Sequence, residues 1–532
     1  MLPTIFSDSY KQSHYQMYPK GLTKLYSNFT ARGSRLKDVN QVVFFGLQYF
    51  LLEYLIKQFN EEFFNRPKQE VIDEHIRLVN PFSTGKVHTE QWEALHDLGY
   101  LPLKIKAVKE GTFVPIGVPM LTVTNTHPDF AWLVNFIETI LSTSLWQAIT
   151  SATIANEYRK ITTKWANETG GDLSFIDWQN HDFSMRGMSS LESAMLSGAG
   201  HLTSFKGSDT IPALVFLEKY YNATGLIAGS VGATEHSVMS CGGKEDEIKT
   251  FERLLDTFPE GILSIVSDTW NLWKVLTDYL PKLKDKIMSR NGKIVIRPDS
   301  GIPEDIICGS GTHPERPTNC DTWEKYLVNK RPEWKFTESE YKGVIELLWE
   351  TFGGTINEKG YKVLDPHIGA IYGDSITLER ANEICSRLES KGFCSTNIVF
   401  GIGSFTYNYN TRDTFGMAMK ATYCEITPME CPRGACVYGI EEACDHDGCA
   451  NELNVECRAI FKDPITDNGS KKSARGLLMV QENGSVPAKL ELVQDVTWEQ
   501  EAQGELEVVF ENSKLIRRQS LEEIRNLIKS QI

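Results

Sequence analysis

The stretch Ile294-Val-Ile-Arg-Pro-Asp-Ser-Gly301 runs from a short β-branched strand pattern directly into a polar turn. The same form recurs where other apolar runs end in polar or glycine-containing turns: Ile262–Val266 before Ser267-Asp268, Ile368–Tyr372 before Gly373-Asp374, and Ile398–Phe400 before Gly401-Ile-Gly-Ser404. Helical patterns follow, such as the stretch Leu378–Leu388. Strands that alternate with helices predict parallel βα units.

Each of these polar turns lies at the carboxyl end of its predicted strand. In an α/β barrel those ends open on one face, where Asp268, Arg297, Asp299, Asp374 and Gly403 would converge although they are far apart in sequence. An open doubly wound sheet also binds ligands at its strand ends, and periodicity does not separate the two folds. We predict the first, as an irregular TIM-like α/β barrel.

The two ends of the chain have a different pattern. A chain of 532 residues exceeds one compact core, so several domains are expected. Short antiparallel strand patterns occur in both terminal parts: Leu103–Val108, Thr112–Val114, Leu121–Val123, Ala488–Val493 and Leu506–Phe510. We therefore predict a β-rich domain formed from residues 1–146 and 414–532 around a barrel at 147–413, with insertions near 307–336 and 425–456.

Composition excludes several classes of protein. The net charge of −15 argues against a general nucleic-acid role, because phosphate backbones select basic surfaces. The most apolar run, Val42–Leu55, is too short to span a membrane. The N-terminus lacks the pattern of a secretory signal, so a cytoplasmic location is the default expectation.

Several strand-end residues suit a phosphorylated sugar. Arg297 can grip a carbonyl or phosphate oxygen, and Asp299 can accept from ribose hydroxyls. Asp374, beside a glycine, suits a sugar hydroxyl or Mg²⁺. The turn Gly401–Ser404 offers backbone N–H groups to a phosphate, and His236 is a candidate acid, base or phosphate acceptor. Taken singly, each also fits an ordinary turn, salt bridge or structural histidine.

Nine motifs in register carry a resemblance to a known family: Asp8-Ser-Tyr-Lys11, Phe45-Gly-Leu-Gln-Tyr49, His181-Asp-Phe183 with Arg186-Gly187, Phe205-Lys-Gly-Ser-Asp-Thr210, Glu235-His-Ser237, Val266-Ser-Asp268, Ile296-Arg-Pro-Asp-Ser-Gly301, Gly373-Asp374 and Phe461-Lys-Asp-Pro464. Over nearly its whole length the chain resembles the nicotinamide phosphoribosyltransferases of the type II phosphoribosyltransferase group. The resemblance implies transfer of phosphoribosyl from phosphoribosyl pyrophosphate to nicotinamide, yielding nicotinamide mononucleotide for NAD salvage.

The resemblance also implies a role for each matching residue. Phe183 and Tyr10 would sandwich the pyridine ring, with Tyr10 supplied by the second subunit of a homodimer. Asp209 would accept from the carboxamide, and Arg297 would face the ring. The ribose and 5-phosphate would contact Asp299, Gly373, Asp374, Gly403 and Ser404. Phosphate and pyrophosphate would contact Arg32, Arg186, Arg412, Lys420, Lys462 and Lys471, and Asp8 and Ser230 complete the set.

In this family ATP phosphorylates a histidine, which His236 matches. Coupling to ATP hydrolysis would then shift synthesis towards the mononucleotide, with Asp268 or Glu235 orienting the imidazole. Mg²⁺ and basic side chains would stabilise the departing pyrophosphate. One departure is Phe405, which follows Gly403-Ser404 where the family has more glycine and would narrow the phosphate pocket.

Other interpretations stay open. A nicotinate phosphoribosyltransferase shares fold and donor, but a nicotinate carboxylate would be repelled by an ionised Asp209. A non-catalytic regulator on the same fold is expected to lose His236, Arg297 or Asp299, all of which are present. A third alternative is a TIM-barrel enzyme of unrelated chemistry. The 425–456 insertion holds Cys431, Cys436, Cys444 and Cys449, which either bind a structural Zn²⁺ or are unpaired thiols.

Overall fold

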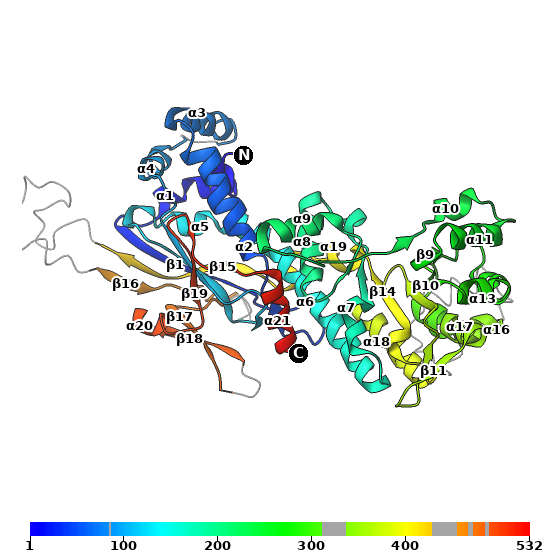
Figure 1. The fold of residues 1–532 in the computed structure, drawn as a ribbon. Coiled ribbons are helices and arrows are strands. Elements are labelled where there is room, and N and C mark those ends of the chain that lie inside the picture. The colour runs from blue at the N-terminus through cyan, green and yellow to red at the C-terminus, as the bar shows by residue number, and fades with distance from the viewer. Residues whose placement is uncertain (84–86, 311–336, 428–454, 467–471, 485–488) are drawn as a thin grey trace, which may run out of the picture. The chain divides into compact units, whose positions relative to one another are not determined.

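The computed structural model describes residues 1–83, 87–310, 337–427, 455–466, 472–484 and 489–532 (Figure 1). The chain forms two compact units. Unit 1 comprises Met1–Thr153, Phe216–Ala223 and Asn410–Ile532, and unit 2 comprises Ile154–Val215 and Thr224–Tyr409. No sequence signal predicted the short return of the chain into unit 1 at Phe216–Ala223. Among the described residues, no helix has both the length and the apolar character needed to cross a membrane.

Unit 1 is built on a seven-stranded sheet with the order β16-β15-β1-β5-β3-β19-β20. Neighbouring strands pair antiparallel. Their bounds are β1 (Leu22–Thr30), β3 (Leu103–Ala107), β5 (Pro119–Asn125), β15 (Ala418–Ile426), β16 (Glu456–Ala459), β19 (Glu507–Glu511) and β20 (Lys514–Leu515). Strands from the two ends of the chain thus lie in one sheet, which confirms the predicted β-rich part.

Period-two patterning explains how this sheet is buried. In β3, Leu103, Ile105 and Ala107 are buried while Lys104 and Lys106 are partly exposed, as expected when successive side chains point to opposite faces. Two small antiparallel pairs accompany the sheet: β2 (Gln41–Val43) with β4 (Phe113–Pro115), and β17 (Leu477–Glu482) with β18 (Leu490–Val496). The helices that lie wholly in unit 1 are α1 (His14–Met17), α2 (Leu47–Phe50), α3 (Lys68–Val79), α4 (Glu90–Leu98), α5 (Leu133–Phe136), α20 (Trp498–Glu501) and α21 (Leu521–Ser530).

A buried carboxylate explains the motif Phe45-Gly-Leu-Gln-Tyr49. Glu110 accepts hydrogen bonds from the backbone N–H of Gly46 (2.6 Å) and Gln48 (2.7 Å), at the start of α2, and from the Tyr221 hydroxyl (2.9 Å). Burial raises the pKa of Glu110, against the effect of these hydrogen bonds. Gln48 donates to the Gln519 carbonyl (3.0 Å). This network is structural: it ties the Phe216–Ala223 return and the C-terminal part into unit 1.

Unit 2 contains a second seven-stranded sheet, in which neighbouring strands pair parallel. The strands are β6 (Asn180–Asp182), β7 (Gly207–Ser208), β8 (Gly232–Ala233), β9 (Glu260–Val266), β10 (Asn291–Arg297), β13 (Ile368–Tyr372) and β14 (Ile398–Ile402). All five residues of β13 are buried, as in strands covered on both faces. These strands include the four strand patterns predicted from sequence.

The segment 229–233 decides between a barrel and an open sheet. Gly229 bridges Gly207 of β7, with the Ser208 N–H donating to the Gly229 carbonyl (3.2 Å). Three residues later, Gly232 and Ala233 pair with β9 at the opposite edge of the sheet. One short segment therefore joins both edges, and each strand lies beside its sequence neighbours around the ring. The irregular barrel is confirmed, and the doubly wound alternative is wrong.

Helices connect the barrel strands. Wholly within unit 2 are α7 (Ile176–Gln179), α8 (Leu191–Leu202), α10 (His236–Cys241), α11 (Glu247–Thr257), α12 (Leu272–Lys274), α13 (Leu280–Met288), α14 (Pro303–Cys308), α16 (Glu338–Lys342), α17 (Val344–Phe352), α18 (Leu378–Ser390) and α19 (Ser404–Asn408). The boundary between the units falls inside α6 (Glu138–Thr169) and α9 (Ile211–Tyr221). A small hairpin, β11 (Gly354–Ile356) with β12 (Lys362–Leu364), precedes β13.

Helix α18 illustrates why these segments are helical. Thr377 caps its N-terminus by accepting from the Arg380 N–H (3.2 Å). Ala381, Ile384, Cys385 and Leu388 recur at helical spacing and are buried.

Candidate active site

Every strand of the barrel ends in a residue that the sequence marks as a site candidate. Phe183 follows β6, Asp209 follows β7, Glu235 and His236 follow β8, Asp268 follows β9, Asp299 follows β10, Gly373 and Asp374 follow β13, and Gly403 and Ser404 follow β14. Parallel strands present their carboxyl ends on one face of a barrel, which is where barrel enzymes place their active sites.

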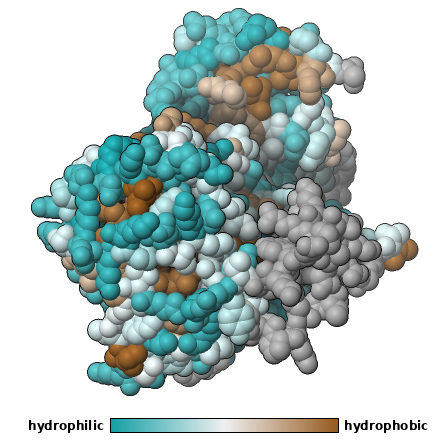
Figure 2. Space-filling view, turned by 90° about the vertical axis from the view of Figure 1, so that its right-hand side faces the viewer, coloured by the Kyte–Doolittle hydropathy of each residue, from teal (hydrophilic) through white to brown (hydrophobic). Residues whose placement is uncertain are grey.

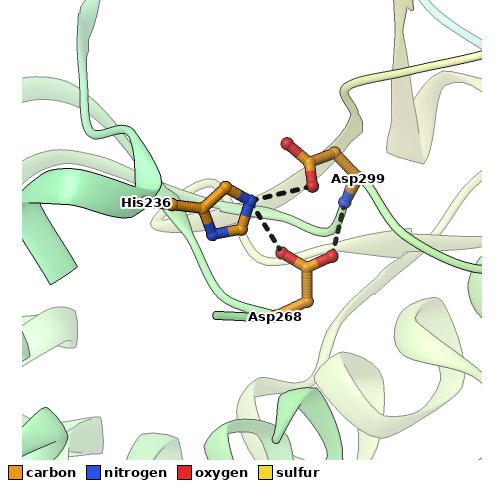
Figure 3. Close-up of side chains that lie close together, drawn as sticks. All are labelled: His236, Asp268 and Asp299. Atoms are coloured by element: carbon orange, nitrogen blue, oxygen red, sulfur yellow. Dashed lines mark hydrogen bonds and ion pairs between the residues drawn. The ribbon is translucent and has the colours of Figure 1, made fainter. Parts of the chain in front are cut away.

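His236 faces two carboxylates (Figure 3). Its Nε2 lies 3.1 Å from Asp299 Oδ1 and 4.0 Å from Asp268 Oδ1, and its Nδ1 lies 3.0 Å from the Thr269 hydroxyl. The imidazole is half-exposed, so it is accessible to a ligand. Asp299 is the nearer carboxylate, whereas the sequence favoured Asp268 or Glu235 as the partner of His236. The Glu235 carboxylate instead accepts from the Ser237 hydroxyl.

Asp268 supports the turn that carries Asp299. Its Oδ2 accepts from the backbone N–H groups of Asp299 (2.9 Å) and Ser300 (2.8 Å) and from the Ser300 hydroxyl (2.5 Å). Its Oδ1 is buried and has no hydrogen-bond partner among the described residues. Donor atoms of His236, Asp268 and Asp299 lie within 4.8 Å of one another. An unsatisfied carboxylate oxygen beside a second carboxylate fits a hard divalent cation such as Mg²⁺.

Asp209 is the anionic centre of a second cluster. Its Oδ1 accepts from His181 Nε2 (2.9 Å) and from the Ser230 hydroxyl. Burial opposes ionisation, but the hydrogen bonds from His181 and Ser230, with the positive charge of Arg297, hold the pKa of Asp209 below its ordinary value. Among the described residues, no group donates a hydrogen bond to Oδ2 of Asp209. An ionised carboxylate with one free oxygen can accept from an amide N–H₂.

Phe183 lies next to this carboxylate. Its ring packs on His181 with centroids 4.7 Å apart, and both residues line a barrel-interior cavity of about 500 Å³ with Asp209 and Ser230. A Cβ at Gly401 would lie 2.8 Å from the Phe183 ring, so the glycine is needed for this approach. Tyr10, the expected second ring, belongs to unit 1, where its side chain is 61% exposed.

The expected sugar-binding residues are close neighbours. Arg297 donates from Nη2 to the Thr234 carbonyl (2.6 Å), and burial is the main cause that lowers its pKa. A Cβ at Gly373 would lie 3.2 Å from Asp299 Cβ and 3.5 Å from Arg297 Cδ. A Cβ at Gly403 would lie 3.7 Å from Asp374 Oδ1. The bare backbone of both glycines thus borders the two carboxylates.

Gly187 and Ser404 also meet. A Cβ at Gly187 would clash with Ser404 Oγ, and Asn408 donates to the Gly187 carbonyl (3.1 Å). The neighbouring Arg186 is exposed. Phe405, expected to narrow this pocket, is 55% exposed and stacks on Tyr409 with centroids 5.2 Å apart.

Unit 1 contains a basic cluster around Lys420 of β15. Burial lowers the pKa of the Lys420 ammonium, and the positive charges of Arg32, Lys462 and Arg412 lower it further. Several cations gathered around one partly buried ammonium suit a polyanion. Lys471 and the cysteines Cys431, Cys436, Cys444 and Cys449 lie outside the described residues. Asp8 accepts from the Thr139 hydroxyl (2.8 Å), which fixes the segment carrying Tyr10.

Sequence reasoning assigned no role to two cavity residues. His181 lies within one of the family motifs. Its hydrogen bond to Asp209, however, joins β6 to the turn after β7, so sequence alone did not indicate it. Ser264 lines the cavity, and its buried Oγ has no hydrogen-bond partner in the part of the chain that the structure describes. A lone serine inside the apolar strand Ile262–Val266 is a signal that could have revealed it.

Known proteins match this chain along its length. The nicotinate phosphoribosyltransferase family model matches residues 178–431, and the nicotinamide phosphoribosyltransferase N-terminal domain matches residues 4–105. A solved nicotinate-nucleotide pyrophosphorylase from Pyrococcus furiosus shares the fold, with a TM-score of 0.54 at 13% identity over 99% of this chain and 95% of that one.

Two relatives share the name nicotinamide phosphoribosyltransferase. The Mycoplasma pneumoniae protein is 38% identical over 78% of this chain and 88% of its own length. The Acinetobacter baylyi protein is 45% identical over 99% of this chain and 96% of its own length. With this identity over almost the whole sequence, the chain belongs to the nicotinamide phosphoribosyltransferase family.

Proposed function

We propose that the protein transfers the phosphoribosyl group of phosphoribosyl pyrophosphate to the ring nitrogen of nicotinamide, releasing nicotinamide mononucleotide and pyrophosphate. The reaction serves NAD salvage, and we expect it in the cytoplasm. The observation that carries the proposal is Asp209, an ionised carboxylate with one free oxygen beside the Phe183 ring. Relatives with the name nicotinamide phosphoribosyltransferase support it.

Selection of the amide follows from charge. A neutral carboxamide donates to the free Oδ2 of Asp209, and Ser264 Oγ, which lines the same cavity and has no described partner, offers a donor for its carbonyl. The nicotinate carboxylate would instead meet a like charge. Stacking on Phe183 suits a flat pyridine, and Tyr10 of a second copy would cover the other face.

Glycosyl transfer needs positioning more than covalent catalysis. As the bond between ribose C1 and pyrophosphate breaks, positive charge builds on the sugar, and the pyridine nitrogen attacks C1 from the opposite face. Asp299 and Asp374 hold the ribose hydroxyls, while the Gly403-Ser404 turn binds the 5-phosphate. Arg186, Arg32, Arg412, Lys420 and Lys462 neutralise the phosphates. When bound at Asp268 and Asp299, Mg²⁺ supplies further positive charge to the departing pyrophosphate.

ATP coupling is proposed at His236. The two carboxylates lie at Nε2, where they can accept its N–H; this orients the ring and leaves Nδ1 of the neutral imidazole as the free nucleophile. The Nδ1 nitrogen, beside the Thr269 hydroxyl, is then the one that accepts the phosphoryl group. Asp299 would contact both His236 and the ribose of the donor. Phosphorylation of His236 could therefore change donor binding through this one carboxylate.

A homodimer would complete the site. Unit 1 exposes Tyr10, Tyr15 and Met17. Unit 2 exposes a further set of large apolar residues at or near its strand-end loops: Leu191, Ile211, Val215, Phe405 and Tyr409. Exposed apolar groups in such number mark interaction surfaces, and the face in Figure 2 shows apolar patches set in a hydrophilic surface. Sedimentation that yields only an active monomer would contradict the dimer.

The test incubates purified protein with phosphoribosyl pyrophosphate, Mg²⁺, ATP and either nicotinamide or nicotinate, and quantifies each mononucleotide. Nicotinamide mononucleotide as the main product supports the proposal. Nicotinate mononucleotide as the main product would overturn the role of Asp209 but keep the donor site. No product from either base would refute the enzymatic assignment.

A further inference from the structure

The barrel cavity is longer than the base site. Its lining starts at Phe183, Asp209 and Ser230, at the carboxyl ends of the strands, and continues to the first residues of β13 and to Thr396 and Asn397, before β14. Cavities of roughly 300–1,000 Å³ hold drug-sized ligands. The volume of about 500 Å³ therefore exceeds what one pyridine ring fills.

Lys293 lies at the far end of this cavity, on the early part of β10. It is the one lysine or arginine among the described lining residues. The Lys293 side chain lies over Gly369 of the neighbouring strand, where a Cβ would be in van der Waals contact with Lys293 Cδ (3.4 Å) and Nζ (3.9 Å). In the described part of the chain, no residue accepts a hydrogen bond from Nζ or forms an ion pair with it.

The surroundings of the Lys293 ammonium disfavour its charged form. Burial lowers the pKa of Lys293, and the charge of Asp365 opposes that effect without contact. Asn397, which lines the same cavity, is already satisfied: it accepts from the Leu364 N–H (2.9 Å) and donates to the Lys362 carbonyl (2.8 Å). A partly buried cation without a partner is costly, and an anionic ligand would supply the missing partner.

We propose that this end of the cavity binds the carboxylate of a small monocarboxylic acid with an apolar body, with the carboxylate paired to Lys293. The wall between the two ends is apolar, formed by Ile262, Val295, Ile371 and Val399. A single cation near Asp365 matches one negative charge, and a phosphate dianion would need more positive charge. If the proposed function holds, an occupant that reaches toward Phe183 also competes with nicotinamide.

Calorimetry with 4-phenylbutyrate tests the site directly, without turnover. Its neutral analogue 4-phenylbutanol and inorganic phosphate serve as comparison probes. We expect 4-phenylbutyrate to bind wild type at least tenfold more tightly than the alcohol. Lys293→Met should abolish that difference, Lys293→Arg should keep it, and Lys284→Met, at an exposed helix position, should leave it unchanged.

Kinetics provide the second readout. The acid should raise the apparent KM for nicotinamide in wild type and not in Lys293→Met. Without the acid, Lys293→Met should have the same kcat with nicotinamide as wild type. Equal binding of acid and alcohol, undiminished acid binding by Lys293→Met, or phosphate binding that is tighter than acid binding and is lost in Lys293→Met would each overturn the proposal. Because binding is measured without the reaction, a failure of the enzymatic assignment would leave these binding results intact.

Discussion

Replacing Asp209 by asparagine should destroy the preference for nicotinamide over nicotinate. Asparagine keeps the shape of the side chain and its ability to pair with His181 and Ser230. It removes the negative charge and places an N–H₂ where a carboxylate oxygen stood. The variant therefore accepts a weaker hydrogen bond from the nicotinamide carboxamide, and it no longer repels the nicotinate carboxylate.

Two effects set the magnitude. A hydrogen bond to a charged acceptor contributes about 1.5–3 kcal/mol, which nicotinamide loses. Two like charges about 4 Å apart repel by about 4 kcal/mol near a protein surface. The Asp209 side chain is 42% exposed, so we reduce that repulsion to about 1–2 kcal/mol for solvent screening. The ratio of kcat/KM values should shift by roughly 3 kcal/mol, on the order of 100-fold.

The assay measures kcat/KM for both bases with saturating phosphoribosyl pyrophosphate. Asp278→Asn, which removes an exposed carboxylate paired with Lys282, is the matched control and should leave the ratio unchanged. Because the pKa of Asp209 lies below its ordinary value, the group stays ionised above about pH 4, and wild-type preference should not change from titration of Asp209 between about pH 5 and 9. An Asp209→Asn enzyme that discriminates as wild type does would refute the charge argument.

Three further outcomes are expected. His236→Asn should abolish nicotinamide-dependent ADP release, and unchanged release would exclude His236 as the phosphate acceptor. Gly187→Val, whose Cβ would clash with Ser404 Oγ, should raise the KM for phosphoribosyl pyrophosphate more than about tenfold, whereas an unaltered KM would separate this turn from the donor. Burial lowers the pKa of His75 to about 4, so the unfolded state takes up the proton first as pH falls below about 6.5, and up to about 3 kcal/mol of stability is lost by pH 4. Denaturant titrations should show that the free energy of unfolding falls less with pH in His75→Gln than in wild type. The same pH dependence in both proteins would refute the role of His75.

Local sequence pattern was enough to predict the parallel strands and where their polar ends lie. Runs such as Ile294–Ile296 and Ile368–Tyr372 are apolar because both faces of the strand are covered, and the residue after each run is polar because it leaves the core. The amino-acid sequence alone therefore assigned Asp268, Asp299, Asp374 and Gly403 to one face of the barrel. Those assignments depend on neighbours in sequence.

What the tertiary structure decided depends on contacts between distant residues. The barrel closes through Gly229 and the two-residue strand β8, too short to carry a periodic signal. Asp299, 63 positions from His236, is its nearest carboxylate, and His181, 28 positions from Asp209, occupies one of its oxygens. Lys293 of β10 lies against Gly369 of β13, 76 positions away in sequence. Strand register and ring closure set these distances, so the partners of each charge, and with them its chemistry, emerge only when the chain is folded.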